Sequence, residues 1–113
     1  MAARNPLVEA PPYAVEQTLK RLGANLRTAR LRRKLTIAET AEKIGTGPRA
    51  VQDAEKGKPT TGIAVFAALL WTFDLLGQLD AVADPARDER GLVLDAAHSA
   101  KRARKKGQLD NDF

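Results

Sequence analysis

The sequence predicts an all-α protein, a compact bundle of four to five helices with flexible tails at both ends. Three observations indicate this class. Apolar residues recur at spacings of three and four, which is the stripe of an amphipathic helix. Residues that favour helix starts and stops separate these stripes from one another. The chain has 113 residues, of which 43% are apolar, and this is enough for one small core but not for two.

The first predicted helix spans residues 13–33. One face of it is apolar, and its members are Val15, Leu19, Leu22, Leu26 and Ala29. The string "KLT" then interrupts the pattern. Thr36 is a favourable N-cap, and Glu39 completes a capping box with it. We therefore expect a second helix from Ile37 to Ile44.

A glycine follows the second predicted helix. Gly45 suits the positive φ that is common just past a helix end, because glycine adopts it without strain. Pro48 suits the first turn of a new helix, where its missing N–H costs nothing. A third helix is therefore predicted over residues 47–56, ended by Gly57 and Pro59.

The remaining elements follow from the same signals. Thr60 or Thr61 can cap a fourth helix over residues 63–72, and a shorter helix near residues 75–82 closes the domain. The predicted organisation is a flexible N-terminal arm over residues 1–12, a folded domain over residues 13–83 and a mobile basic tail over residues 84–113.

The formal net charge of +5 is unevenly distributed along the chain. Residues 1–60 carry a net +6, residues 61–96 a net −4 and residues 97–113 a net +3. Two basic flanks favour a polyanionic partner. Ordinary solvated helix faces are the alternative explanation of the same charges.

Composition argues against several classes of protein. The chain has no cysteine, which excludes disulfides, thiolate metal sites and a thiol nucleophile, and a reducing cytoplasm suits it. His98 is the only histidine and no acid–base pair, metal cluster or phosphate-binding glycine loop is apparent, so we expect neither an enzyme nor a cofactor. The apolar run over residues 63–79 is shorter than the roughly 20 residues that cross a bilayer. We therefore expect a cytoplasmic, nucleoid-associated protein without a membrane segment.

The second and third predicted helices are short and joined by a tight turn, so they must cross closely. Ala41 provides a small side chain at the crossing and Gly45 allows the chain to reverse. Val51 and Ala54 then face back onto Ile44 and the first helix. This is the geometry of a helix-turn-helix, whose second helix is free to enter a DNA major groove.

The strings "LGANLRTARLRRKLT", "AEKIG" and "EKG" resemble the helix-turn-helix of the phage-repressor-like (Xre, Cro/C1-type) family, a lambda-repressor-like DNA-binding fold. The resemblance covers residues 22–79. The positions that fit the motif are Ala41, Ile44, Gly45, Val51 and Ala54. Thr40 stands where leucine is usual, Thr46 where an apolar residue is common, and Ile37 where the family favours a DNA-contacting glutamine.

The resemblance implies a buried ion pair between Arg30 and Glu55, which ties the recognition helix to the scaffold. The exposed face of that helix offers base readers: Arg49 can pair with guanine and Gln52 with adenine. Asp53 lies on the same side and can either accept from cytosine or repel phosphate. The expected phosphate contacts are Thr36, Thr46, Gly47, Lys56, Lys58 and Thr60. Ordinary surface lysines are the alternative for Lys56 and Lys58.

A single helix-turn-helix gives too little affinity for specific binding, and proteins of this type usually dimerise. Two recognition helices then meet successive major grooves about 34 Å apart on palindromic double-stranded DNA. The apolar residues in excess of a small core are Leu70, Trp71, Phe73, Leu75, Leu76 and Leu79. We predict that they form a homodimer interface, with an oversized core as the alternative.

The C-terminal tail holds five basic residues between Lys101 and Lys106 and ends in Phe113. Its composition favours disorder. A small DNA-binding domain followed by such a tail is similar to the HipB-type antitoxins, which repress their own operon and restrain a HipA-type kinase toxin. The resemblance implies that Leu109 and Phe113 bind the partner. A stand-alone phage-type or metabolic repressor and an adaptor acting by protein binding are the alternatives, and the basic run can equally be a nonspecific phosphate clamp or a soluble tail.

Overall fold

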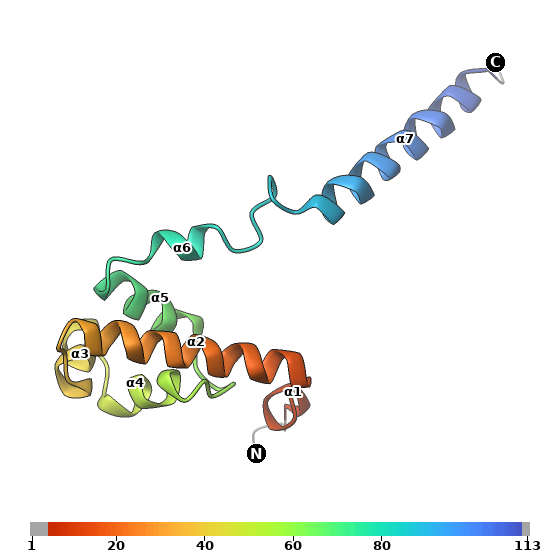
Figure 1. Ribbon diagram of the computed structural model, residues 1–113. Helices are drawn as coiled ribbons and strands as arrows, with labels where there is room; N and C mark the ends of the chain where they lie inside the picture. The colour runs from red at the N-terminus through yellow and green to blue at the C-terminus, as the bar shows by residue number, and fades with distance from the viewer. Residues whose placement is uncertain (1–4, 112–113) are drawn as a thin grey trace. The chain divides into compact units, whose positions relative to one another are not determined.

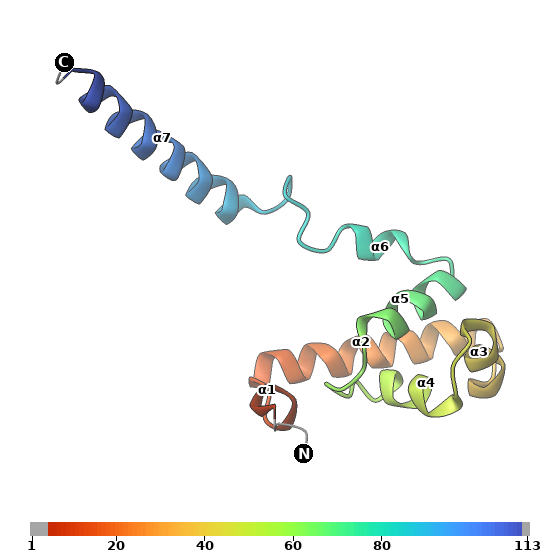
Figure 2. The same cartoon turned by 180° about the vertical axis from the view of Figure 1, so that it is seen from behind.

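The computed structural model describes the backbone of residues 5–111 and the side chains of residues 5–106. Within residues 5–111 the chain forms seven helices and no strand, which confirms the all-α class (Figures 1 and 2). The helices are α1 (Pro6–Glu9), α2 (Tyr13–Arg32), α3 (Ile37–Ile44), α4 (Pro48–Glu55), α5 (Ile63–Thr72), α6 (Gly77–Asp80) and α7 (Glu89–Asn111). None of the helices in this part of the chain combines the length and apolarity needed to cross a membrane.

The chain divides into two units, Met1–Leu79 and Asp80–Phe113. The division falls inside α6, close to but not at the predicted boundary after Ala83. In the first unit α4 contacts α2, α3 and α5, and the views show α3 and α4 folded back against the C-terminal half of α2 (Figures 1 and 2). The core of this unit consists of Leu26, Ala29, Ala41, Val51, Ala54, Phe66, Leu69, Leu70 and Phe73.

The predicted cap of the fourth helix is wrong. We expected Thr60 or Thr61, but Gly62 is the N-cap of α5, and among the described residues no side chain caps this end. The reason is a turn just before α5, in which the N–H of Thr61 donates to the carbonyl of Lys58 at 3.0 Å. Both threonines belong to that turn, so the helix starts after them.

The predicted flexible arm contains one short helix. Asn5 caps α1 by accepting a hydrogen bond from the N–H of Leu7 at 3.1 Å, and Pro6 occupies the first turn. Proline at this position sacrifices no intrahelical hydrogen bond. The predicted arm therefore contains a helical turn over Pro6–Glu9.

The tail, for which composition predicted disorder, is helical from Glu89 to Asn111. The prediction of its secondary structure was therefore wrong. Basic residues there alternate with alanine and leucine, and all of these are strong helix formers. At the start of α7 the Asp88 carboxylate accepts a hydrogen bond from the N–H of Gly91 at 2.9 Å. High charge and high helix propensity coexist in this segment, and helix propensity decides the local structure.

Two glycines allow the end of α4 to approach the backbone of α2. A Cβ atom on Gly23 would lie 2.5 Å from the carbonyl oxygen of Glu55 and 2.7 Å from that of Ala54. Gly57 adopts a φ of 70°, and a Cβ there would lie 2.5 Å from the carbonyl oxygen of Leu19. Both contacts are backbone contacts, so no side-chain rearrangement can relieve them.

Gly23→Ala tests this close approach. Helix propensity alone predicts that alanine stabilises the middle of a helix by about 1 kcal/mol. Because the added methyl group must push α4 away from α2, we expect instead a net loss of roughly 1–3 kcal/mol in the free energy of unfolding. Chemical denaturation measures it, with Gly77→Ala as the control, since no described atom lies within 4 Å of a Cβ at Gly77. A Gly23→Ala variant that matches or exceeds the parent in stability would contradict the close approach.

Candidate nucleic-acid interface

The start of α3 carries the predicted capping box. Thr36 Oγ1 accepts a hydrogen bond from the N–H of Glu39 at 3.0 Å, and Glu39 Oε1 accepts one from the N–H of Thr36 at 3.1 Å. The hydrogen bonds from Thr36 lower the pKa of the Glu39 carboxyl, which is therefore ionised at neutral pH. A phosphate approaching the start of α3 would therefore meet this negative charge.

The chain between α3 and α4 reverses through a left-handed glycine. Gly45 has a φ of 77°. Its N–H donates to the carbonyl of Glu42 at 3.2 Å, and the N–H of Thr46 donates to the carbonyl of Ala41 at 3.0 Å, which together form a Schellman motif. Pro48 then opens α4, as predicted. The turn thus satisfies carbonyls at the end of α3 without any side-chain cap.

The inner faces of α3 and α4 are buried against each other. Ala41, Val51 and Ala54 all belong to the core. Thr40 is buried too, and its hydroxyl donates to the carbonyl of Thr36 at 2.8 Å, so the position that usually holds leucine carries a satisfied polar group. Since one face of α4 is fixed in this way, its opposite face is left to solvent.

A bidentate ion pair holds the C-terminal end of α4. Nε and Nη2 of Arg30 donate to the Glu55 carboxylate at 2.7 and 3.0 Å, and Nη1 donates to the carbonyl of Leu35 at 2.8 Å. The Arg30 and Glu55 side chains are each only 7% exposed. The hydrogen bond that Arg30 donates to Glu55 raises the pKa of its guanidinium further, so Arg30 remains charged. The ion pair implied by the family resemblance is therefore present and buried.

The exposed face of α4 presents Arg49 and Gln52. The Arg49 side chain is 81% exposed and Gln52 is exposed as well. The two residues are three positions apart and share a face of the helix. The arrangement offers one guanidinium and one amide to a ligand outside the domain.

Asp53 differs from Arg49 and Gln52, because its side chain is only 23% exposed. Its Oδ1 atom lies 3.2 Å from Nζ of Lys58 and 3.7 Å from Nε of Arg49. No directional hydrogen bond reaches this buried oxygen within the described residues, so the two contacts are ionic. Sequence reasoning missed this cluster, although the spacing of Arg49 and Asp53 is that of a helical ion pair.

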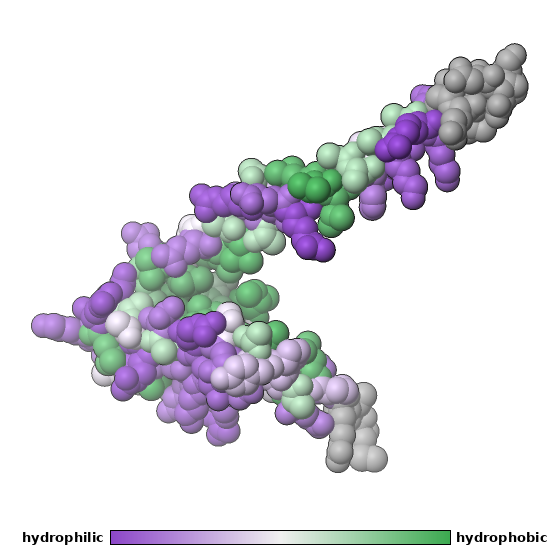
Figure 3. Space-filling view, turned by 45° about the vertical axis from the view of Figure 1, so that its right-hand side comes forward, coloured by the Kyte–Doolittle hydropathy of each residue, from purple (hydrophilic) through white to green (hydrophobic). Residues whose placement is uncertain are grey.

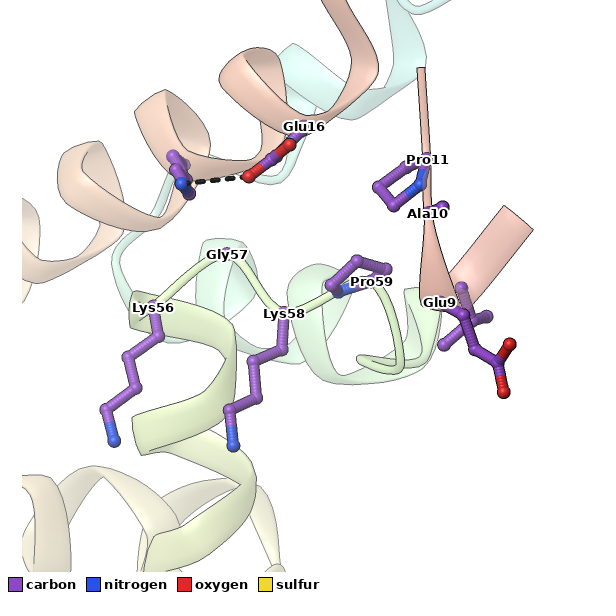
Figure 4. A pocket seen from close by; sticks show the side chains of 10 residues that line it. Glu9, Ala10, Pro11, Glu16, Lys56, Gly57, Lys58 and Pro59 are labelled. Carbon is purple, nitrogen blue, oxygen red and sulfur yellow. Dashed lines mark ion pairs between the residues drawn. The ribbon is translucent and has the colours of Figure 1, made fainter. Parts of the chain in front are cut away.

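Lys56 and Lys58 flank Gly57 at the end of α4. Figure 4 shows their side chains extended side by side in the same direction, away from Glu16. Their stems line a surface pocket of about 440 Å³ together with Pro59 and residues of α1 and α2. The two ammonium groups therefore face one side of the domain. Lys20, also in the pocket wall, is instead paired with Glu16 at 3.0 Å.

The other predicted phosphate contacts lie at turns. Gly47 is the exposed N-cap of α4, where the described side chains provide no cap and the first turn holds no acidic residue. Thr46 beside it is half-buried, and Thr60 is exposed in the turn before α5. The N-terminus of α4 is thus free of the carboxylate that stands at the start of α3, and it is the better place for an anion.

Two residues of the predicted dimer interface belong to the core. Leu70 is 8% exposed and Phe73 is 1% exposed, so neither is available to a second copy, and this part of the prediction is wrong. The core uses these residues because α5 must cover α3 and α4. Arg33 packs against Phe73. Its Nη2 donates to the carbonyl of Phe73 at 2.7 Å, and its guanidinium lies 5.4 Å from the centre of the Phe73 ring.

The other four residues of the predicted dimer interface differ in their exposure. Leu75 and Leu79 are partly buried against the core. Trp71 is 63% exposed and Leu76 is 38% exposed. The apolar surface that remains for a partner therefore centres on Trp71.

The predicted partner-binding residues of the tail are not described in side-chain detail. The backbone of Leu109 belongs to α7, but its side chain and all of Phe113 lie outside the described residues. Within the described residues no group of three or more His, Asp or Glu side chains could hold a metal ion.

A family model described as Helix-turn-helix matches residues 26–73, from the middle of α2 to the residue after α5. This segment is a helix-turn-helix domain. The match indicates a DNA-binding transcription regulator. Comparison with curated proteins and comparison with solved structures each found no match.

Glu55→Ala tests what the ion pair contributes to the helix-turn-helix domain. Removing the carboxylate leaves the Arg30 charge buried and unpaired, so we expect a loss of about 3–5 kcal/mol in the free energy of unfolding. Glu16→Ala is the matched control, because it breaks an exposed pair and should cost less than about 1 kcal/mol. Denaturation curves of both variants provide the comparison. A Glu55→Ala variant that is fully stable yet fails to bind DNA would instead assign Glu55 to the DNA contact.

Proposed function

We propose that the chain is a sequence-specific transcriptional repressor that binds a palindromic DNA operator as a homodimer. The two-sided environment of α4 carries the proposal. Val51 and Ala54 on one face are buried in the domain, while Arg49 and Gln52 on the other are exposed. A helix held in this way can enter a major groove without loss of any contact within the domain.

Arg49 and Gln52 are the proposed base readers. The Arg49 guanidinium can donate two hydrogen bonds to guanine, and the Gln52 amide can both donate to and accept from adenine. Asp53 is a positioning residue in this proposal, because its carboxylate lies beside Arg49 and Lys58 and restrains both cations. Removing Asp53 would leave these two side chains less ordered.

Phosphate contacts on both sides of α4 set its register in the groove. The N–H groups at the start of α4 favour an anion there. The parallel Lys56 and Lys58 side chains supply positive charge at the other end (Figure 4). The proposed phosphate-binding residues are Thr36, Thr46, Gly47, Lys56, Lys58 and Thr60.

Homodimerisation is proposed through Trp71 and Leu76. Trp71 is a large aromatic side chain left exposed beside the buried Leu70 on α5, and tryptophan is enriched at protein interfaces. Dimerisation would pair two α4 helices with successive major grooves about 34 Å apart.

We further propose that the repressor is the antitoxin of a HipBA-like toxin–antitoxin system, which restrains a HipA-type kinase toxin. Its support is the layout, in which the unit that holds the helix-turn-helix is followed by a second unit whose last part, residues 97–113, carries a net charge of +3. A stand-alone repressor and a protein-binding adaptor are the competing functions. The neighbouring gene distinguishes the first, and a salt-dependent gel shift on DNA upstream of the chain's own gene distinguishes the second.

Arg49→Ala tests base reading. We expect binding to the specific site to weaken by about 1–3 kcal/mol, with nonspecific binding nearly unchanged. Arg49→Lys is the matched variant, because it keeps the charge and loses the bidentate fork, so it should also lose specificity. Fluorescence anisotropy on specific and shuffled duplexes measures both. Equal losses on the two duplexes would make Arg49 a phosphate contact.

Deletion of residues 108–113 tests the antitoxin proposal. It removes two negative charges and Phe113 but keeps all five basic residues from Lys101 to Lys106. Operator binding should stay intact or become slightly stronger, whereas capture of the protein encoded by the neighbouring gene should weaken because an aromatic anchor is lost. Phe113→Ala in the full chain separates the aromatic group from the charges. Equal retention of that protein by all three forms would contradict this role of the tail.

A further inference from the structure

Over residues 92–106, helix α7 buries no side chain within its own unit. Every side chain of residues 92–106 is exposed, and no residue from 80 to 106 is buried. Helix stability in proteins comes mainly from packing, and the described part of α7 gains little of it. A ligand bound along its surface would therefore stabilise α7.

Three basic residues of α7 share one face with His98. His98, Lys101, Arg102 and Lys105 recur at spacings of three and four, and they line a shallow depression of about 220 Å³. The opposite face is formed by Leu92, Val93, Ala96, Ala100 and Ala103. In Figure 3 the first half of α7 carries hydrophobic surface, and hydrophilic surface follows further along the helix.

We propose that α7 is a second DNA-binding element, whose face of His98, Lys101, Arg102 and Lys105 binds the phosphate backbone of duplex DNA. The inference rests on the proposed function, since the helix-turn-helix domain brings α7 to DNA. Tethering then raises the local concentration of the helix at the duplex. The binding is independent of base sequence, because only phosphates are contacted.

Charge and size favour duplex DNA over other ligands. Five cations lie between Lys101 and Lys106, and a duplex carries one negative charge per roughly 1.7 Å of its axis. The face from His98 to Lys105 is roughly 11 Å long, a length over which a duplex presents several phosphate charges. A lipid surface fits less well, because the opposite face of α7 offers mostly alanine where bilayer insertion requires large apolar side chains.

A pair of matched double variants of the full chain tests the inference. Arg102→Ala/Lys105→Ala removes two charges from the basic face, while Arg104→Ala/Lys106→Ala removes two charges that lie outside this face of the same helix. The probe is a shuffled-sequence duplex of about three helical turns, titrated over a range of salt concentrations. We expect the slope of log affinity against log salt to fall by roughly two for the first variant and by clearly less for the second. Equal slopes in the two variants would overturn the assignment of a binding face.

Ala103→Pro tests whether the helical alignment matters. It keeps every charge but breaks the helix between Arg102 and Lys105. The proposal expects a reduced slope, whereas the full slope would show an unstructured polycation and contradict a helical face. Failure of the proposed function and failure of the α7 inference give different results. If the parent chain binds no duplex, the proposed function fails, and if the parent binds while all three variants keep its slope, only the role of α7 fails.

Discussion

The ion pair between Arg30 and Glu55 is the interaction on which the candidate interface depends. One guanidinium, carried by α2, holds both the carboxylate at the end of α4, 25 residues away in the chain, and the carbonyl of Leu35 just before α3. Because both charges are buried, loss of either partner leaves the other without compensation. Gly23 allows the last carbonyls of α4 to approach the backbone of α2 closely. The ion pair and this close packing therefore support the same orientation of α4. That orientation leaves Arg49 and Gln52 in solvent.

Charged side chains also determine which parts of the surface around α4 favour a negative ligand. Asp53 sits between Arg49 and Lys58 as a partly buried negative charge, so it orders two cations without presenting a free carboxylate. Glu39 closes the start of α3 with its own carboxylate, whereas the start of α4 at Gly47 holds no acidic residue. The start of α4 is therefore the more favourable of these two helix N-termini for a negative ligand.

Local signals predicted most of the fold. The bounds of α3 and α5 were predicted correctly, since a capping box and a left-handed glycine define α3 and an apolar run defines α5. Long-range packing was not predictable: Leu70 and Phe73 belong to the core, because an apolar residue needed by a neighbouring helix looks the same in sequence as one at an interface. The helicity of α7 was missed because charge was weighed above helix propensity. The role of Asp53 depends on Lys58, which meets it only after the chain turns at Gly57.

The central claim is that the exposed face of α4 reads a DNA sequence. Binding of the full chain to duplex DNA from upstream of its own gene, compared with a shuffled duplex of the same composition at one physiological salt concentration, tests this claim most directly. The account predicts that the upstream duplex binds about a thousandfold or more tightly than the shuffled one. Equal affinities for the two duplexes would contradict it, because phosphate contacts alone would then explain all of the binding.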